Sequence, residues 1–226
     1  VGPLINAETR QLVNAAYLGA SHCWEEIRGN DPADLDFEVT WIGYWFNLPG
    51  ETLDPTLVSN DFIDGGADVL ISGIDTTEAI TVAGQRAAAG ETVWAVPYDY
   101  VLACDTAPEV CLGVPYFSWA PSYVEIAQSV IDGTYESEFQ WLAPAWDQLD
   151  DPESTPVGYL KGPALDAEDE VALDEFIAGL ADGSVNLWTG PLNLQDGTPW
   201  LAEGETATDQ QIWFTEQLLE GIEGAT

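Results

Sequence analysis

The sequence has few basic side chains, no methionine and no long apolar run. Only four Lys and Arg stand against 40 Asp and Glu in 226 residues, which gives a formal net charge of -36. A nucleic-acid-binding protein needs clustered Lys and Arg to displace counterions from phosphate, so we expect no nucleic-acid partner. A membrane span needs roughly 20 consecutive apolar residues. The longest mainly apolar run, 69–74, is far too short.

The acidity does not indicate disorder, because 46% of the residues are hydrophobic and can bury a core. The first interpretation is a solvated surface adapted to high salt, where screening relieves repulsion between carboxylates. The alternative is capture of a cation. No Asp-rich calcium-loop pattern is present, so metal binding is the minor hypothesis and we assign no metal ligand. No Gly-rich phosphate loop is present either, and we expect no cofactor.

Histidine and cysteine are also scarce. Cys104 and Cys111 bracket the short segment CDTAPEVC, which could close as a disulfide in an oxidising compartment. With His22 as its one histidine, the chain lacks the partners of a zinc site. Cys23 follows His22 in a predicted helix, where adjacent side chains diverge, so a Cys-His catalytic pair is not favoured.

Helical and strand-like segments alternate through the first 133 residues. The pattern predicts helices at 7–22, 54–63, 77–89 and 121–131, and strands at 36–45, 67–72, 92–99 and 110–117. Asn6 is a predicted N-cap and Gly133 a predicted helix stop. Strand and helix in steps of roughly 30 residues are typical of an α/β fold with a parallel sheet and right-handed crossovers. Beyond Gly133 we expect helices at 166–181 and 209–219 and a short strand in NLWTGPL.

Aromatic and acidic side chains coincide at the ends of three predicted strands. Ligands of open parallel sheets bind outside these carboxyl ends. Aromatic side chains can stack on a flat ring, and carboxylates can accept from its N–H groups or from sugar hydroxyls. We therefore predict a ligand site there, although each aromatic taken singly is also suited to core packing. The side chains are Tyr44, Trp45, Phe46 and Asn47, then Ser72 and Asp75, then Tyr98, Asp99 and Tyr100.

Several motifs in order resemble one known family, the basic membrane protein (BMP) type of substrate-binding lipoprotein of ABC importers. They are VGPLINAETRQLVNAAYLGA, WIGYWFN, IDGGADVLISGID, AVPYD, VPYFSWAPSYVEIAQSVIDGTYES, NLWTGPLNLQDGTPW and EGETATDQQIWFTEQLLEGIEG. The resemblance implies a type I periplasmic-binding-protein fold, in which two Rossmann-like lobes close on a ligand. It also implies that roughly the first third of such a protein is not in this chain.

On this resemblance, residues 1–135 form the C-terminal α/β lobe and residues 136–226 form a tail that returns towards the missing N-terminal lobe. Trp45 or Phe46 resembles the aromatic that stacks on a base, and Asp75 resembles an acidic residue facing the cleft. Asp99 resembles the acid near a ribose, and Trp119 is expected to add a wall of the site.

The implied function is a non-catalytic, extracytoplasmic binder of a purine base or nucleoside that delivers its ligand to an ABC-importer membrane permease. Two alternatives stay open. One is a ligand-sensing domain of a signalling protein. The other is a carboxylate-dependent hydrolase, although among 40 acidic residues some suggestive pair is always found.

Overall fold

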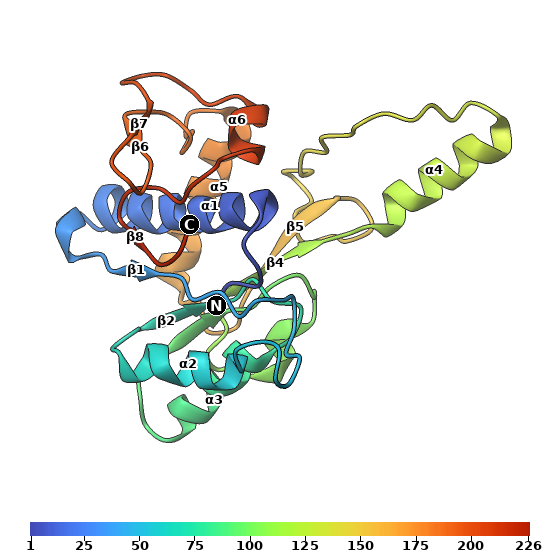
Figure 1. Cartoon of the computed structure of the whole chain (residues 1–226). Helices are drawn as coiled ribbons and strands as arrows, with labels where there is room; N and C mark the ends of the chain where they lie inside the picture. Colours follow the sequence, from blue (N-terminus) through green and yellow to red (C-terminus); the bar gives the residue numbers. More distant parts are fainter. The chain divides into compact units, whose positions relative to one another are not determined.

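The computed structural model describes residues 1–226 and divides into two compact units. Unit 1 consists of residues 1–65 and 171–226, which are far apart in sequence, and unit 2 is the continuous segment 66–170. Figure 1 shows the whole chain, coloured from blue at the N-terminus to red at the C-terminus. The predicted boundary near residue 135 lies inside unit 2. This boundary was inferred from the family resemblance, and it stays a prediction.

The first helix of unit 1 begins where its capping residue predicts. Helix α1 (Ala7–His22) has Asn6 as its N-cap, whose side chain accepts from the Thr9 N–H at 2.9 Å. The Thr9 hydroxyl oxygen in turn accepts from the Asn6 N–H at 3.0 Å, so two otherwise unpaired donors are satisfied. Helix α2 (Pro55–Asp64) starts after Asp54, which caps it, with Pro55 in the first turn.

The strands of unit 1 are short. Strand β1 (Phe37–Glu38) pairs in parallel with β8 (Ile222–Glu223), and β6 (Leu192–Asn193) pairs antiparallel with β7 (Pro199–Leu201). The predicted strand 36–45 was therefore wrong in its extent. Gly43 takes a φ of +100°, a conformation that glycine adopts without steric cost, and the aromatic residues after it lie in a loop.

The end of the chain packs onto α1. Helix α6 (Asp209–Trp213) is shorter than the predicted 209–219. Asn14, fully buried on α1, accepts from the Leu219 N–H at 3.0 Å and donates to the Gln217 carbonyl oxygen at 3.2 Å. These bonds satisfy buried backbone groups without a helix. The core of unit 1 is built from Leu18, Val39, Leu218, Leu219 and Ile222, with several tryptophans packed against it.

Unit 2 contains the predicted α/β alternation. Strand β2 (Val69–Ile71), helix α3 (Glu78–Ala88) and strand β3 (Trp94–Val96) form one βαβ unit, and its two strands pair in parallel. Strand β4 (Gly113–Phe117) follows a 3-10 helix at Ala103–Thr106 and continues alongside β3 through parallel bridges. The predicted α/β class is confirmed.

The sequence pattern predicted a parallel sheet, whereas the sheet of unit 2 also contains an antiparallel pair. Strand β5 (Val157–Lys161) runs antiparallel to β4 over five paired residues. Between them lie helix α4 (Ala120–Asp132), which ends at Gly133 in the left-handed conformation, and an irregular segment, 133–156. Helix α5 (Ala167–Asp182) continues from unit 2 into the second segment of unit 1.

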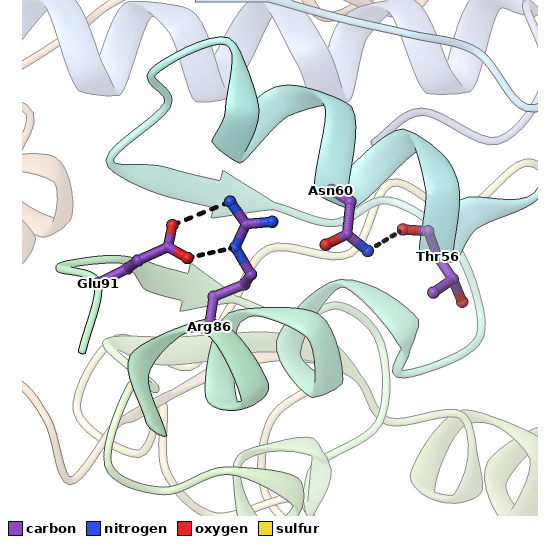
Figure 2. A network of polar contacts seen from close by, with 4 residues as sticks. All are labelled: Thr56, Asn60, Arg86 and Glu91. Carbon is purple, nitrogen blue, oxygen red and sulfur yellow. Dashed lines mark hydrogen bonds and ion pairs between the residues drawn. The ribbon is translucent and has the colours of Figure 1, made fainter. Parts of the chain in front are cut away.

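Arg86 and Lys161 each form an ion pair with a nearby acid. The Arg86 guanidinium meets both carboxylate oxygens of Glu91, at 2.7 and 3.0 Å, as Figure 2 shows. Figure 2 also shows Asn60 donating to the Thr56 carbonyl oxygen within α2, at 2.8 Å. Lys161 lies 3.0 Å from Glu170. No helix is both long enough and apolar enough to cross a bilayer.

Candidate functional site

Asp75 lies on the turn between β2 and α3. Strand β2 is followed by the buried Ser72, whose hydroxyl oxygen accepts from the Ile74 N–H at 3.4 Å. Ile74 is completely buried, whereas the Asp75 side chain is exposed. The buried Ser72 and Ile74 therefore hold the turn in place. The Asp75 carboxylate lies at the carboxyl end of β2, where ligands of α/β sheets bind.

Asp99 occupies the corresponding position after β3 in an unusual conformation. Its φ is +65°, and no other residue apart from glycines has a positive φ. The Tyr100 N–H donates to the Tyr98 carbonyl oxygen at 2.8 Å, which closes a three-residue turn around Asp99. The Asp99 N–H donates to the Pro115 carbonyl oxygen of β4 at 3.0 Å. Strained backbone that the surrounding structure holds in place occurs preferentially at functional sites.

The charge of Asp99 acts on the Asp75 carboxyl group. Desolvation, followed by the negative charge of Asp99, raises the pKa of Asp75 above its ordinary value of 3.8. Burial likewise raises the pKa of Asp99. A carboxylate that has lost part of its hydration and lies near a second carboxylate gains more from a hydrogen-bond donor than a fully solvated one. The pair is thus suited to N–H or O–H donors of a ligand.

A continuous row of aromatic rings begins beside Asp99. Tyr98 contacts Phe117 edge to face at 6.0 Å between ring centroids, and Phe117 lies 5.6 Å from Trp119. Trp119 is largely exposed and stacks with Tyr123 of α4 at 6.3 Å. The sequence analysis singled out Trp119 and Tyr98 but missed Phe117 and Tyr123. Phe117 is two residues before Trp119, the spacing of one strand face, and Tyr123 is four residues after it, the spacing of one helix face. These spacings would have indicated the row.

Trp45 and Phe46 belong to unit 1. They lie in the loop after Gly43, where Trp45 is half-buried and Phe46 is exposed and packs edge to face on Tyr44 at 5.0 Å. The Leu48 N–H donates to the Thr52 hydroxyl oxygen at 2.9 Å and holds this loop closed. Asp75, Asp99 and Trp119 thus belong to unit 2, where the charge of Asp99 acts on Asp75, whereas Trp45 and Phe46 belong to unit 1.

Two polar atoms next to Asp75 were missed by the sequence analysis. The Thr76 hydroxyl and one carboxylate oxygen of Glu78 are buried, and neither has a hydrogen-bond partner. Both residues are at the start of α3, and Thr77, the N-cap of that helix, provides no side-chain cap. Buried polar groups are usually paired, so this turn retains unused hydrogen-bonding capacity beside the carboxylate pair.

A disulfide joins Cys104 and Cys111. It closes the loop that follows Asp99 and ends beside β3, where the Ala95 N–H donates to the Val110 carbonyl oxygen at 2.8 Å. Cys111 is completely buried. The bridge therefore links the 3-10 helix at Ala103–Thr106 to the segment that pairs with β3, the strand that precedes Asp99.

The other residues with reactive side chains are not gathered into a site. The His22 ring packs 5.3 Å from that of Phe176, and Cys23 is an exposed free cysteine. No group of three or more His, Cys, Asp or Glu side chains has an arrangement that could hold a metal ion. A pocket of about 360 Å³ in unit 1 contains none of the predicted ligand-binding residues, and Trp200, Gln211 and Phe214 are among its lining residues.

The chain is similar to two proteins of related description. It is 29% identical over 226 residues to the "Purine-binding protein BAB2_0673" of Brucella abortus (strain 2308), a match covering 99% of this chain and 56% of that protein. Its structure matches an ABC transporter solute-binding protein from Conexibacter woesei DSM 14684 with a TM-score of 0.52 and 17% identity. That match covers 82% of this chain and 54% of the other. No family model matches the chain.

The predicted resemblance to a substrate-binding protein of ABC importers is confirmed by these two similarities. The structural match shows the fold, and both relatives are named as binding proteins rather than enzymes. The chain spans about half the length of each relative that it matches.

Proposed function

We propose that this chain is part of the solute-binding component of an ABC importer and that the ligand is a purine base or nucleoside. The observation that carries the proposal is the 29% identity to a purine-binding protein along 99% of the chain. The protein acts outside the cytoplasm, performs no catalysis and delivers its ligand to a membrane permease.

The unit 2 site has the chemistry that a purine requires. A purine offers two flat faces and, at its edge, N–H groups; a nucleoside adds ribose hydroxyls. Asp75 and Asp99 are acceptors, and because both carboxylates have lost part of their hydration, they gain from donors of this kind. Trp119 provides an exposed indole, and its ring is connected through Phe117 to Tyr98, the residue before Asp99.

Trp45 supplies the stacking surface, with Phe46 as the alternative. In base-stacking proteins an aromatic-to-Ala substitution costs about 1 to 3 kcal/mol of binding. We expect Trp45→Ala to weaken purine binding by that amount and Leu57→Ala, at an exposed position of α2, to leave it unchanged. Phe46→Ala shows which of the two adjacent aromatics faces the ligand.

A panel of ligands tests the proposal in a thermal-shift assay of the complete gene product. Adenine, adenosine and guanosine should each raise the melting temperature in a saturable way, because a ligand that binds only the folded state stabilises it. A simple sugar and an amino acid are the controls. Stabilisation by either control but by none of the purines contradicts the proposal.

A further inference from the structure

Helix α4 has two faces of opposite character. At about 100° per residue, its apolar side chains cover an arc of about 160°. This arc contains Trp119 at the N-cap, followed by Tyr123, Val124, Ile126, Ala127, Val130 and Ile131. The remaining arc is polar and includes Gln128, whose amide donates to the Asp132 carboxylate at 3.0 Å. An amphipathic helix of this kind normally covers a core with its apolar arc.

In this chain most of the apolar arc of α4 is uncovered. No residue of the helix is buried, and Ile131 is 77% exposed. The segment after the helix continues the pattern, since its large apolar side chains are also exposed and Phe139 stacks on Trp141. We call these residues the α4 surface: Trp119, Tyr123, Val124, Val130, Ile131, Tyr135, Phe139, Trp141, Leu142 and Trp146. So many exposed large apolar side chains in one short segment indicate an interaction site.

The charge of the molecule argues against two occupants of the α4 surface. The range 119–146 contains Glu125, Asp132, Glu136 and Glu138 but neither Lys nor Arg. An amphipathic helix that binds an anionic membrane needs cations on its polar face. A second copy of the chain also carries a net charge of -36, so self-association is opposed by repulsion.

The lengths of the relatives point to a third occupant. The chain matches 56% of the purine-binding protein and 54% of the solute-binding structure, so a large part of each lies outside the match. A covalently attached segment reaches an effective concentration on the order of mM, which overcomes modest charge repulsion. Residues 171–226 are not available as the occupant, because they belong to unit 1 and supply Leu218, Leu219 and Ile222 to its core.

We propose that the α4 surface is the docking face for the part of a two-lobed solute-binding protein that lies outside the matched span. This proposal rests on the proposed function for the class of protein but not for its ligand. It assigns the contact to α4 and residues 133–146 and gives residues 171–226 no part in it. Once docked, the exposed indoles and aliphatic side chains become core residues of the assembled lobe.

Co-expression tests the docking. The chain 1–226 is produced together with the remaining part of the same gene product, which carries an affinity tag, and retention of the untagged chain is measured without any purine. We expect retention by the unsubstituted chain and at least a tenfold loss, of the order seen for interface hot spots, for Val130→Asp combined with Ile131→Asp. Leu57→Asp is the matched control because Leu57 is also an exposed apolar residue of a helix.

Hydrogen exchange provides a second measurement that does not require the separate piece to fold. The backbone amides of α4 should exchange slowly in the complete gene product and rapidly in the chain 1–226. Each of the following results overturns the proposal: a gene that encodes no further residues, equal exchange of α4 in both proteins, or equal losses for the α4 and Leu57 variants. Dimerisation or binding to anionic vesicles that the α4 substitutions abolish also overturns it. Failure of purine binding with docking intact would instead overturn only the proposed ligand.

Discussion

Strand β4 and helix α4 are consecutive in the chain and both rich in apolar residues, but they have opposite environments. In β4, Val114 and Tyr116 are almost completely buried and the strand has neighbours on both edges. In α4, two residues further on, none of the apolar side chains is buried. The difference teaches that the local pattern determines which element forms, whereas burial depends on which other segments are available to cover it.

Truncation of one valine in each element is expected to produce the largest contrast. Val114→Ala removes two methyl groups from a fully buried site, so we expect a loss of about 2 to 3 kcal/mol in the free energy of unfolding, towards the low end of large-to-small core substitutions. Val124 lies on the exposed α4 surface, so Val124→Ala should change the free energy of unfolding by less than about 0.5 kcal/mol. Urea unfolding of the two variants measures both values. Similar losses would show that α4 is covered within the chain itself.

Removal of the disulfide tests the stability of the buried region that contains β3 and β4. For a loop of eight residues, the chain-entropy model gives about 2.5 kcal/mol of stabilisation, which the Cys104→Ser, Cys111→Ser double variant should lose. Before unfolding is measured, thiol titration in denaturant without reductant should find one free thiol, Cys23. Three free thiols would contradict both the bridge and the proposed oxidising location.

The sequence predicted the elements of both regions better than their surroundings. Asn6 and Gly133 marked helix ends by their capping chemistry, and β2, α3 and β3 were found from their periodicity. The antiparallel partner of β4 could not be predicted, because β5 follows a long irregular segment whose path depends on tertiary contacts. The end of α6 was also missed, since it depends on the amide of Asn14, about 200 residues away.

For the candidate site, too, the sequence predicted the positions of residues better than their tertiary contacts. Asp75 and Asp99 were identified as positions after strands and Trp119 from the family resemblance, and all three residues lie in unit 2. The positive φ of Asp99 was not predictable, because a hydrogen bond from its own N–H to Pro115 of β4 holds it. Their roles in binding stay predictions.

A charge-removing substitution tests the coupling of the two carboxyl groups. Asp99→Asn keeps a residue that tolerates a positive φ but removes the charge, so the pKa of Asp75 should fall towards 3.8. NMR titration of the carboxyl carbons measures this shift, with the exposed Asp182 as the control. An unchanged Asp75 pKa would mean that the two groups do not sense each other.

The sign of the pH dependence follows from the raised pKa values. When folding raises a carboxyl pKa, the native state binds more protons than the unfolded chain, and stability falls as pH rises from about 3.8 through the raised value. Asp99→Asn should therefore be more stable than the parent chain at neutral pH, and the difference should disappear well below pH 3.8.

Salt should have the smallest effect per residue but act on the whole chain. With 40 acidic and four basic side chains, most carboxylates have no cationic partner, and the compact state suffers more from their repulsion than the expanded chain. The Debye length falls from ~10 Å at 0.1 M to ~3 Å at 1 M salt, so the melting temperature should rise between these concentrations. Sucrose controls for general solute exclusion. A flat or falling melting temperature would refute salt adaptation and favour a cation-binding role.

Calorimetric titration with adenosine, of the complete gene product and of the chain 1–226 side by side, tests the central claim most directly. The account predicts saturable binding of one adenosine by the complete protein and weak or undetectable binding by the chain alone, because half of a two-lobed site leaves the ligand in water. Equal affinity in both proteins would contradict the two-lobed site. Absence of adenosine, guanosine and adenine binding to the complete protein, together with binding of a sugar or an amino acid, would contradict the purine assignment.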